Sequence, residues 1–159
     1  IAKAAGPTGI AGAGAPDRVA AALEAGADHG VNYAELDLTE EVMRITEGAG
    51  VNLVYDNISS PKTWPRALKS LAHGGRLVTA GAHGGGKVDL DCDVLYHNHI
   101  TIKGASGSTR SDLDAILAIA GTLRMPIERI FPLSQAAEAH CLIETTVPPG
   151  KIILDPTMG

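Results

Sequence analysis

The sequence predicts an α/β protein in which helices cover both faces of a parallel sheet. Strand and helix periodicities alternate along nearly all of the 159 residues. Such alternation is typical of parallel sheets, and right-handed crossovers make the sheet doubly wound. Aromatic residues contribute only 3% of the sequence, so the core must consist of alanine, valine, isoleucine and leucine.

Apolar runs and the residues that flank them place the individual elements. Residues 1–5 are predicted to be the end of a helix, and the helix at 17–25 lies between Pro16 and Gly26. Thr39 is the predicted cap of a third helix. Later helices are predicted at residues 62–72, 111–123 and 134–144, with a short helix or turn at 94–98. Strands are predicted at residues 8–13, 29–33, 51–56, 76–81, 100–104, 127–132 and 151–154.

Composition and charge argue against several classes of partner. The net charge is -5 without a basic run, so we expect neither nucleic acid nor an anionic membrane as a partner. The two cysteines, Cys92 and Cys141, do not have the spacing of a zinc site. The sequence carries no recognisable signal peptide or long apolar segment, which predicts a cytoplasmic protein.

The carboxyl ends of the predicted strands are the expected place for a ligand. These ends lie after Ala13, Asp56, Gly81 and Gly104. The sequence does not place a nucleophile, a base and an orienting group together, and it has no G-x-S-x-G turn.

Two further patterns have a structural interpretation that is favoured over a functional one. His97 and His99 would share one face of a strand, but no carboxylate or cysteine nearby completes a metal site. The glycines at 84–86 lack the Lys-Ser/Thr pair of a phosphate-binding P-loop, so they are interpreted as a flexible connection.

Six short motifs follow one another along the chain: GADHGVNY at 26–33, VNLVYD at 51–56, LAHGGRLVTAGA at 71–82, IKGAS at 102–106, FPLSQAAEAH at 131–140 and GKIIL at 150–154. Together they resemble the C-terminal half of the medium-chain dehydrogenase/reductase family, the zinc-type alcohol dehydrogenases, and most closely its quinone oxidoreductase branch. The resemblance covers nearly the whole chain. It implies a partial Rossmann-type dinucleotide-binding domain over residues 1–159, in which 150–159 would return to a catalytic domain.

The resemblance also implies a strand order and a reaction. In the family, a first strand and a glycine-rich loop come before the helix end at residues 1–5, and we expect this chain to lack both. In the order 3-2-1-4-5-6, strand 1 lies between strands 2–3 and strands 4–6. The family transfers hydride between a nicotinamide and a carbonyl, quinone or alkene. We therefore expect a cofactor-binding fragment of an NAD(P)H-dependent oxidoreductase that is inactive on its own, without a zinc site.

The choice between NADP and NAD depends on the end of the second strand. An acid there binds the ribose 2′-hydroxyl of NAD, and residues 11–15 contain none. Arg18 follows one helical turn later, where a guanidinium can bind a 2′-phosphate. Tyr33 matches a family position near that phosphate and the adenine. NADP is therefore the expected cofactor, with NAD as the alternative; a surface role for Arg18 and Tyr33 is the structural interpretation.

The resemblance places the nicotinamide at three strand ends. The predicted contacts are Ser60, Thr79, Ala80, Gly81, Ala82, Ala105, Ser106 and Gly107, and ordinary turn chemistry is the alternative for each. The family also implies a homodimer through the edge strand at residues 100–104. Two other functions remain open, namely a non-catalytic structural or oligomerising fragment and a methyltransferase with the same sheet.

Overall fold

The computed structural model describes residues 3–123, 125–146, 148 and 150–158. These residues form two compact units: unit 1 is Ile1–Gly30 with Ile116–Gly159, and unit 2 is Val31–Ala115. The elements, in chain order, are η1 (Lys3–Ala5), β1 (Ile10–Ala13), α1 (Pro16–Glu24), β2 (His29–Asn32), α2 (Leu38–Ile45), β3 (Val51–Asp56), α3 (Trp64–Lys69), β4 (Leu71–Thr79), α4 (Cys92–His97), β5 (Thr101–Gly104), α5 (Arg110–Ile119), η2 (Ala120–Thr122), β6 (Ile127–Pro132), η3 (Leu133–Gln135), α6 (Ala136–Thr146) and β7 (Lys151–Asp155).

The strands confirm the predicted fold class, an α/β protein of Rossmann type. β3, β4 and β5 form a parallel sheet in that order, and β6 pairs in parallel with β7. β1 pairs with β2 in a separate sheet. The organisation as one dinucleotide-binding domain stays a prediction.

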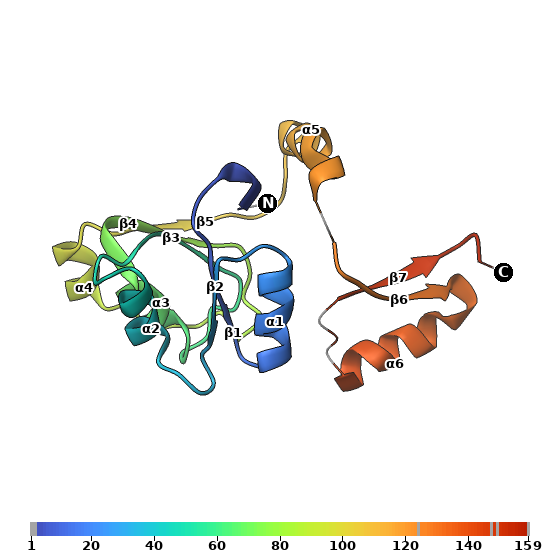
Figure 1. The fold of residues 1–159 in the computed structure, drawn as a ribbon, viewed down its shortest axis with the longest axis horizontal. Coiled ribbons are helices and arrows are strands. Elements are labelled where there is room, and N and C mark those ends of the chain that lie inside the picture. Colours follow the sequence, from blue (N-terminus) through green and yellow to red (C-terminus); the bar gives the residue numbers. More distant parts are fainter. Residues whose placement is uncertain (1–2, 124, 147, 149, 159) are drawn as a thin grey trace. The chain divides into compact units, whose positions relative to one another are not determined.

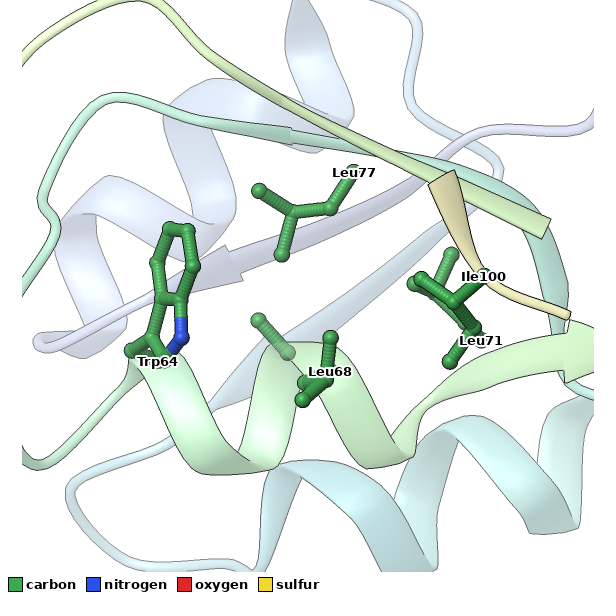
Figure 2. Close-up of a cluster of buried hydrophobic side chains, with 6 residues drawn as sticks. Trp64, Leu68, Leu71, Leu77 and Ile100 are labelled. Carbon is green, nitrogen blue, oxygen red and sulfur yellow. The ribbon is translucent and has the colours of Figure 1, made fainter. Parts of the chain in front are cut away.

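The core of unit 2 lies on one face of the sheet β3-β4-β5, against α3 and α4 (Figure 1). Its buried members are Trp64, Ala67, Leu68, Leu71, Leu77 and Ile100 (Figure 2). Period-2 alternation brings Leu77 to this face, and its register partners Val54 and Ile102 pack there as well. On the opposite face of β3, Leu53 is 54% exposed and Tyr55 is 68% exposed.

Trp64 occupies the start of α3 and points into this core. Its side chain is buried, and Pro65 occupies the first turn of the helix behind it. Among the buried side-chain nitrogen and oxygen atoms of the described residues, the indole Nε1 is the one without a hydrogen-bond partner. Apolar packing therefore holds the ring in place, because no hydrogen bond does so.

The start of α2 differs from the prediction that Thr39 caps it. The cap is Asp37, whose Oδ1 accepts hydrogen bonds from the backbone N–H of Thr39 at 2.8 Å and of Glu40 at 3.1 Å. A carboxylate suits this place because it also faces the positive end of the helix. The Thr39 hydroxyl instead donates to the backbone carbonyl of Arg66, at 3.2 Å.

In unit 1, the carboxylate of Asp28 connects the segments on either side of α1. One oxygen binds the Lys3 ammonium, and the other accepts the backbone N–H of Gly9 at 2.8 Å. Two hydrogen bonds lower the pKa of Asp28. The one from Lys3 has the larger effect, and the one from Gly9 the smaller. In the C-terminal part of this unit, α6 runs along β6 and β7 (Figure 1), and the Arg129 guanidinium lies 4.5 Å from the ring centre of the buried Phe131.

Among the described residues, no helix is long and apolar enough to span a membrane.

Candidate functional site

The loops that follow β3 (residues 57–63, the β3 loop) and β4 (residues 80–91, the β4 loop) run side by side in unit 2. Backbone N–H groups of the β4 loop donate to consecutive carbonyls that begin at the end of β3: Ala80 to Asp56, His83 to Asn57, Gly84 to Ile58 and Gly86 to Ser59. The two strand ends therefore share a hydrogen-bonded extension. Of the predicted contact residues, Ala80 takes part in this extension, Ser60, Gly81 and Ala82 lie in the same two loops, and Thr79 ends β4.

Glycine permits this close approach at two points. A methyl group at Gly84 would lie 2.5 Å from Cβ of Ser60 and 2.8 Å from the carbonyl oxygen of Ile58. A methyl group at Gly81 would lie 3.0 Å from the carbonyl oxygen of Asn57. Larger side chains at either position would push the loops apart, so these glycines serve backbone contact.

The interpretation of residues 84–86 as a flexible connection gives way to a more specific role. Gly84 and Gly86 donate their N–H groups to the β3 loop, and Gly85 donates to the carbonyl of Ala82 at 3.1 Å. A phosphate cradle needs N–H groups that point at the ligand. Because all three donate within the protein, this run cannot serve as such a cradle in the present conformation.

A buried hydroxyl lies at the centre of the two loops. Ser59 is 5% exposed, and its Oγ lies 2.9 Å from Oδ2 of Asp56, 3.0 Å from Oγ1 of Thr79 and 2.9 Å from the carbonyl oxygen of Gly81. Asp56, 8% exposed, also accepts the backbone N–H groups of Ile58 at 3.2 Å and Ser59 at 3.0 Å. Both oxygens of this buried carboxylate therefore have a donor within the loops.

The structure brings the predicted nicotinamide-side residues of β4 and β5 together. The N–H of Ala105 donates to the carbonyl of Thr79 at 2.9 Å, so the loop 105–109 (the β5 loop) starts beside the end of β4. Residues 105–107 are exposed there. Thr109 and Asp112 then cap α5 through hydrogen bonds in both directions. Both hydrogen bonds from Thr109 lower the pKa of Asp112, and the one from the hydroxyl has a larger effect than the one from the backbone N–H.

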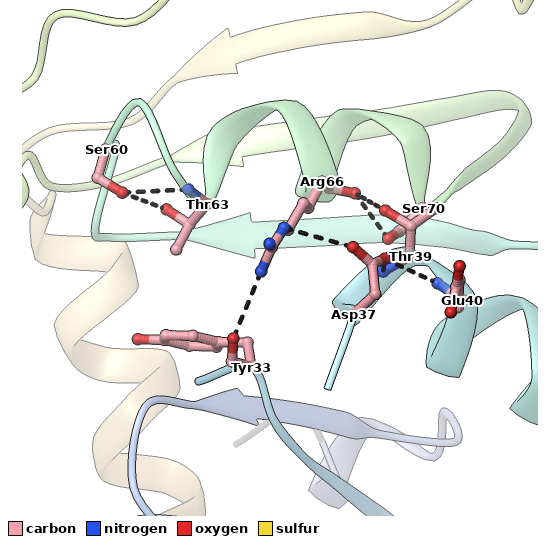
Figure 3. Close-up of polar contacts among 8 residues, drawn as sticks. All are labelled: Tyr33, Asp37, Thr39, Glu40, Ser60, Thr63, Arg66 and Ser70. Carbon is pink, nitrogen blue, oxygen red and sulfur yellow. Dashed lines mark hydrogen bonds and ion pairs between the residues drawn. The ribbon is translucent and has the colours of Figure 1, made fainter. Parts of the chain in front are cut away.

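Ser60 has a different set of contacts from its neighbour Ser59. Its Oγ lies 2.8 Å from the Thr63 hydroxyl and accepts the Thr63 backbone N–H at 3.1 Å. These contacts close the turn that leads into α3 (Figure 3). Ser60 is half-buried, so its hydroxyl serves the turn while part of the side chain faces solvent.

On the predicted adenine side, Arg66 of α3 contacts the segment after β2. Its Nη1 donates to the carbonyl of Tyr33 at 3.4 Å, and its Nε lies 3.5 Å from Oδ2 of Asp37 (Figure 3). The Tyr33 backbone is thus tied to α3 and to the cap of α2. Arg18, the other predicted adenine-side residue, is exposed on α1 in unit 1.

The sequence patterns did not indicate a role for the side chains of Ser59, Asp56 or Arg66. The pattern Asp-x-x-Ser directly after a strand is a signal for side chain to backbone hydrogen bonds, and it could have indicated the first two. Arg66 gives no such signal, since its partners are more than twenty residues away in sequence.

His97 ends α4 and His99 precedes β5, so the two histidines do not lie on one strand. The ring of His99 lies 4.8 Å from that of His73, and Nδ1 of His97 lies 3.4 Å from a carboxylate oxygen of Asp93. Within the described residues, no three His, Cys, Asp or Glu side chains gather closely enough to hold a metal ion. The donors present in this part of the chain therefore do not fit a zinc ion.

The arrangement favours binding over proton or group transfer. The hydrogen-bonded Ser–Asp pair found among the described residues, Ser59 with Asp56, is buried and its hydrogen bonds are made within the loops, so it cannot reach a substrate. Among the predicted contact residues at these strand ends, the exposed ones have small side chains: Ala80, Ala82, Ala105, Ser106 and Gly107. Such a surface suits a flat, neutral ring that lies against the main chain.

Known proteins resemble this chain in both sequence and structure. The model of a family described as zinc-binding dehydrogenase matches residues 1–121. Quinone oxidoreductase 1 of Escherichia coli is 28% identical over 98% of this chain and 51% of its own length. An NAD-dependent alcohol dehydrogenase of Saccharolobus solfataricus is 33% identical over 88% of this chain and 41% of its own length.

A solved structure of E. coli quinone oxidoreductase, complexed with NADPH, matches with a TM-score of 0.78 and 28% identity, over 98% of this chain and 51% of that one. The chain thus spans about half the length of the curated relatives that it matches.

Proposed function

Because the chain belongs to the zinc-binding dehydrogenase family, whose model matches residues 1–121, we propose that it forms the dinucleotide-binding part of an NAD(P)H-dependent oxidoreductase. The observation that carries this proposal is the joined set of strand ends at β3, β4 and β5, where Ala80, Ala82 and residues 105–107 expose small side chains and backbone. A bound nicotinamide would supply the hydride. The residues of this chain would bind and orient it, and the acceptor would be a carbonyl, quinone or alkene.

The predicted contact residues have separate tasks in this proposal. Residues 79–82 and 105–107 would hold the nicotinamide end, with Ser60 beside the ribose. Tyr33, whose backbone Arg66 fixes, would lie near the adenine. The cytoplasmic location expected from the sequence also stays a prediction.

We expect NADPH to bind more tightly than NADH. Arg18 is exposed near the start of α1, where a helix N-terminus and a guanidinium both favour a phosphate. Asp17 precedes it and opposes part of this effect. Arg18→Glu should raise the NADPH dissociation constant by about tenfold, because one charge-assisted contact with the phosphate is lost. The dissociation constant of NADH should change little, because NADH has no 2′-phosphate.

Titration of the full chain, followed by the fluorescence of each nucleotide, measures both constants. Lys151→Glu makes the same change of charge at an exposed position of β7 and should leave both constants unaltered. NADH binding that equals or exceeds NADPH binding would contradict the preference.

A non-catalytic structural or oligomerising role is the second candidate function. The separation of the described strands into three sheets favours it, because a dinucleotide normally lies across one continuous sheet. The same titration decides between the two functions. Saturable binding of either nucleotide supports the oxidoreductase part, whereas its absence supports the structural role.

We further propose that two copies pair through β5, which ends the sheet order β3-β4-β5. Ile102 packs against the core, so a charge at that position would disturb folding. Thr101 and Lys103 are exposed. In a two-fold edge pairing centred on Ile102, residue 101 of one copy faces residue 103 of the other.

Thr101→Lys places like charges opposite each other in that dimer, whereas Thr101→Glu places opposite charges there. Light scattering at several concentrations should show weaker association for Thr101→Lys than for Thr101→Glu. A monomeric mass for the unsubstituted chain, or equal masses for both variants, would count against this dimer.

A further inference from the structure

Ser59 combines three features that are seldom found in one residue. It is buried, its backbone has a φ of 49°, and its hydroxyl contacts atoms of both the β3 and the β4 strand ends. Side chains larger than hydrogen disfavour the left-handed region to which this φ belongs. The surrounding contacts must therefore hold the residue in that conformation.

The hydroxyl links groups that would otherwise be held only by the backbone. It carries one proton, which it donates to the Asp56 carboxylate or to the Gly81 carbonyl, and its oxygen can accept the proton of Thr79. Gly81 and Thr79 belong to the predicted nicotinamide surface. Ser59 itself is covered by both loops, so it does not form part of the surface that a ligand would contact.

We propose that Ser59 is a positioning residue, whose hydroxyl fixes the β3 and β4 loops together so that the nicotinamide surface is preformed. This inference rests on the proposed function for its consequence in binding. Without the hydroxyl, the carboxylate of Asp56 keeps only its two backbone donors, and Thr79 keeps only the longer contact of 3.3 Å to the Gly81 carbonyl. The β4 loop then separates from the β3 loop more often.

Two substitutions at this position separate the hydroxyl from the backbone strain. Ser59→Ala removes the hydroxyl and keeps the strain, whereas Ser59→Gly removes both. Ser70→Ala is the matched control, because Ser70 is equally buried and its hydroxyl donates to the carbonyl of Arg66 at 2.7 Å, away from both loops. It loses a buried hydrogen bond without altering the strand ends.

Amide hydrogen exchange of the full chain, followed by NMR without ligand, tests the positioning directly. In both Ser59 variants, the amides of Gly84 and Gly86 should exchange about tenfold faster, the effect of one lost buried hydrogen bond. The Val51 amide, which donates to the Ser70 carbonyl at the other end of β3, should change little. Unchanged exchange at Gly84 and Gly86, or protection that Ser59→Gly retains, would overturn the proposal.

Nucleotide titration of the same variants then tests whether the positioning serves binding. The NADPH dissociation constant should rise about tenfold in both Ser59 variants and stay constant in Ser70→Ala. Faster exchange with unchanged NADPH affinity would overturn the positioning role. If the unsubstituted chain binds no nucleotide, the proposed function is wrong. The exchange data would then show that the hydroxyl serves only the folding of the two loops.

Discussion

Replacing Leu77 with alanine should lower the free energy of unfolding by about 2–5 kcal/mol, the range for truncation of a fully buried leucine. Leu77 is 0% exposed and lies on β4, the middle strand of the sheet β3-β4-β5. It packs in one cluster with Leu68 and Ile100 (Figure 2). Truncation leaves a cavity that a strand paired on both edges cannot close by moving.

Urea denaturation followed by circular dichroism measures this loss. Leu53→Ala is the control, because Leu53 is a leucine on the neighbouring strand whose side chain is 54% exposed. It should cost roughly 1 kcal/mol or less, since little apolar area leaves water there on folding. Equal losses for the two variants would contradict the assignment of the core to the α3 side of the sheet.

Gly50→Ala should be the more destabilising of two glycine substitutions that precede β3. Gly50 and Gly48 both have left-handed backbones, with φ of 74° and 84°. A methyl group at Gly50 would lie 2.7 Å from the backbone nitrogen of Ala72, whereas one at Gly48 would meet nothing within 4 Å. Gly48→Ala therefore measures the backbone strain alone, about 1–2 kcal/mol.

Gly50→Ala adds a steric clash with the backbone at the start of β4, which we expect to cost roughly 1–3 kcal/mol more. Comparison of the two denaturation midpoints isolates the cost of the clash. Both Gly→Ala substitutions reduce the conformational entropy of the unfolded chain by the same amount, so that contribution cancels. Midpoints that coincide would show that the chain before β3 moves away from β4 at little cost.

The elements that the sequence predicts best are those whose residues determine their own conformation. The strand at 51–56 is reproduced to the residue, because its four apolar or strand-favouring residues, Val51, Leu53, Val54 and Tyr55, lie between a glycine and a polar turn. β4 begins earlier than expected, at Leu71, because Leu71 pairs with Val51 before a register shift that contains Gly74 and Gly75, which have no strand preference of their own. Pairing between distant segments outweighs local propensity there.

The sequence predicts some parts of the candidate site and not others. The strand ends themselves follow from the alternation of elements, so residues 79–82 and 105–107 could be placed at one edge of the sheet. The contact of Thr79 with Ser59, and that of Arg66 with Tyr33, depend on how loops fold against one another. Such contacts have no periodicity in the sequence, because they form only when segments distant in sequence fold against one another.

The buried indole of Trp64 has a spectroscopic consequence. It is the only tryptophan of the sequence, it lies in unit 2, and its N–H makes no hydrogen bond among the described residues. An indole in apolar surroundings emits at shorter wavelength than one in water, so the emission maximum should move to the red when this core opens. Tryptophan emission therefore reports the unfolding of residues 31–115, and a probe of overall helix content would be needed to follow the rest of the chain.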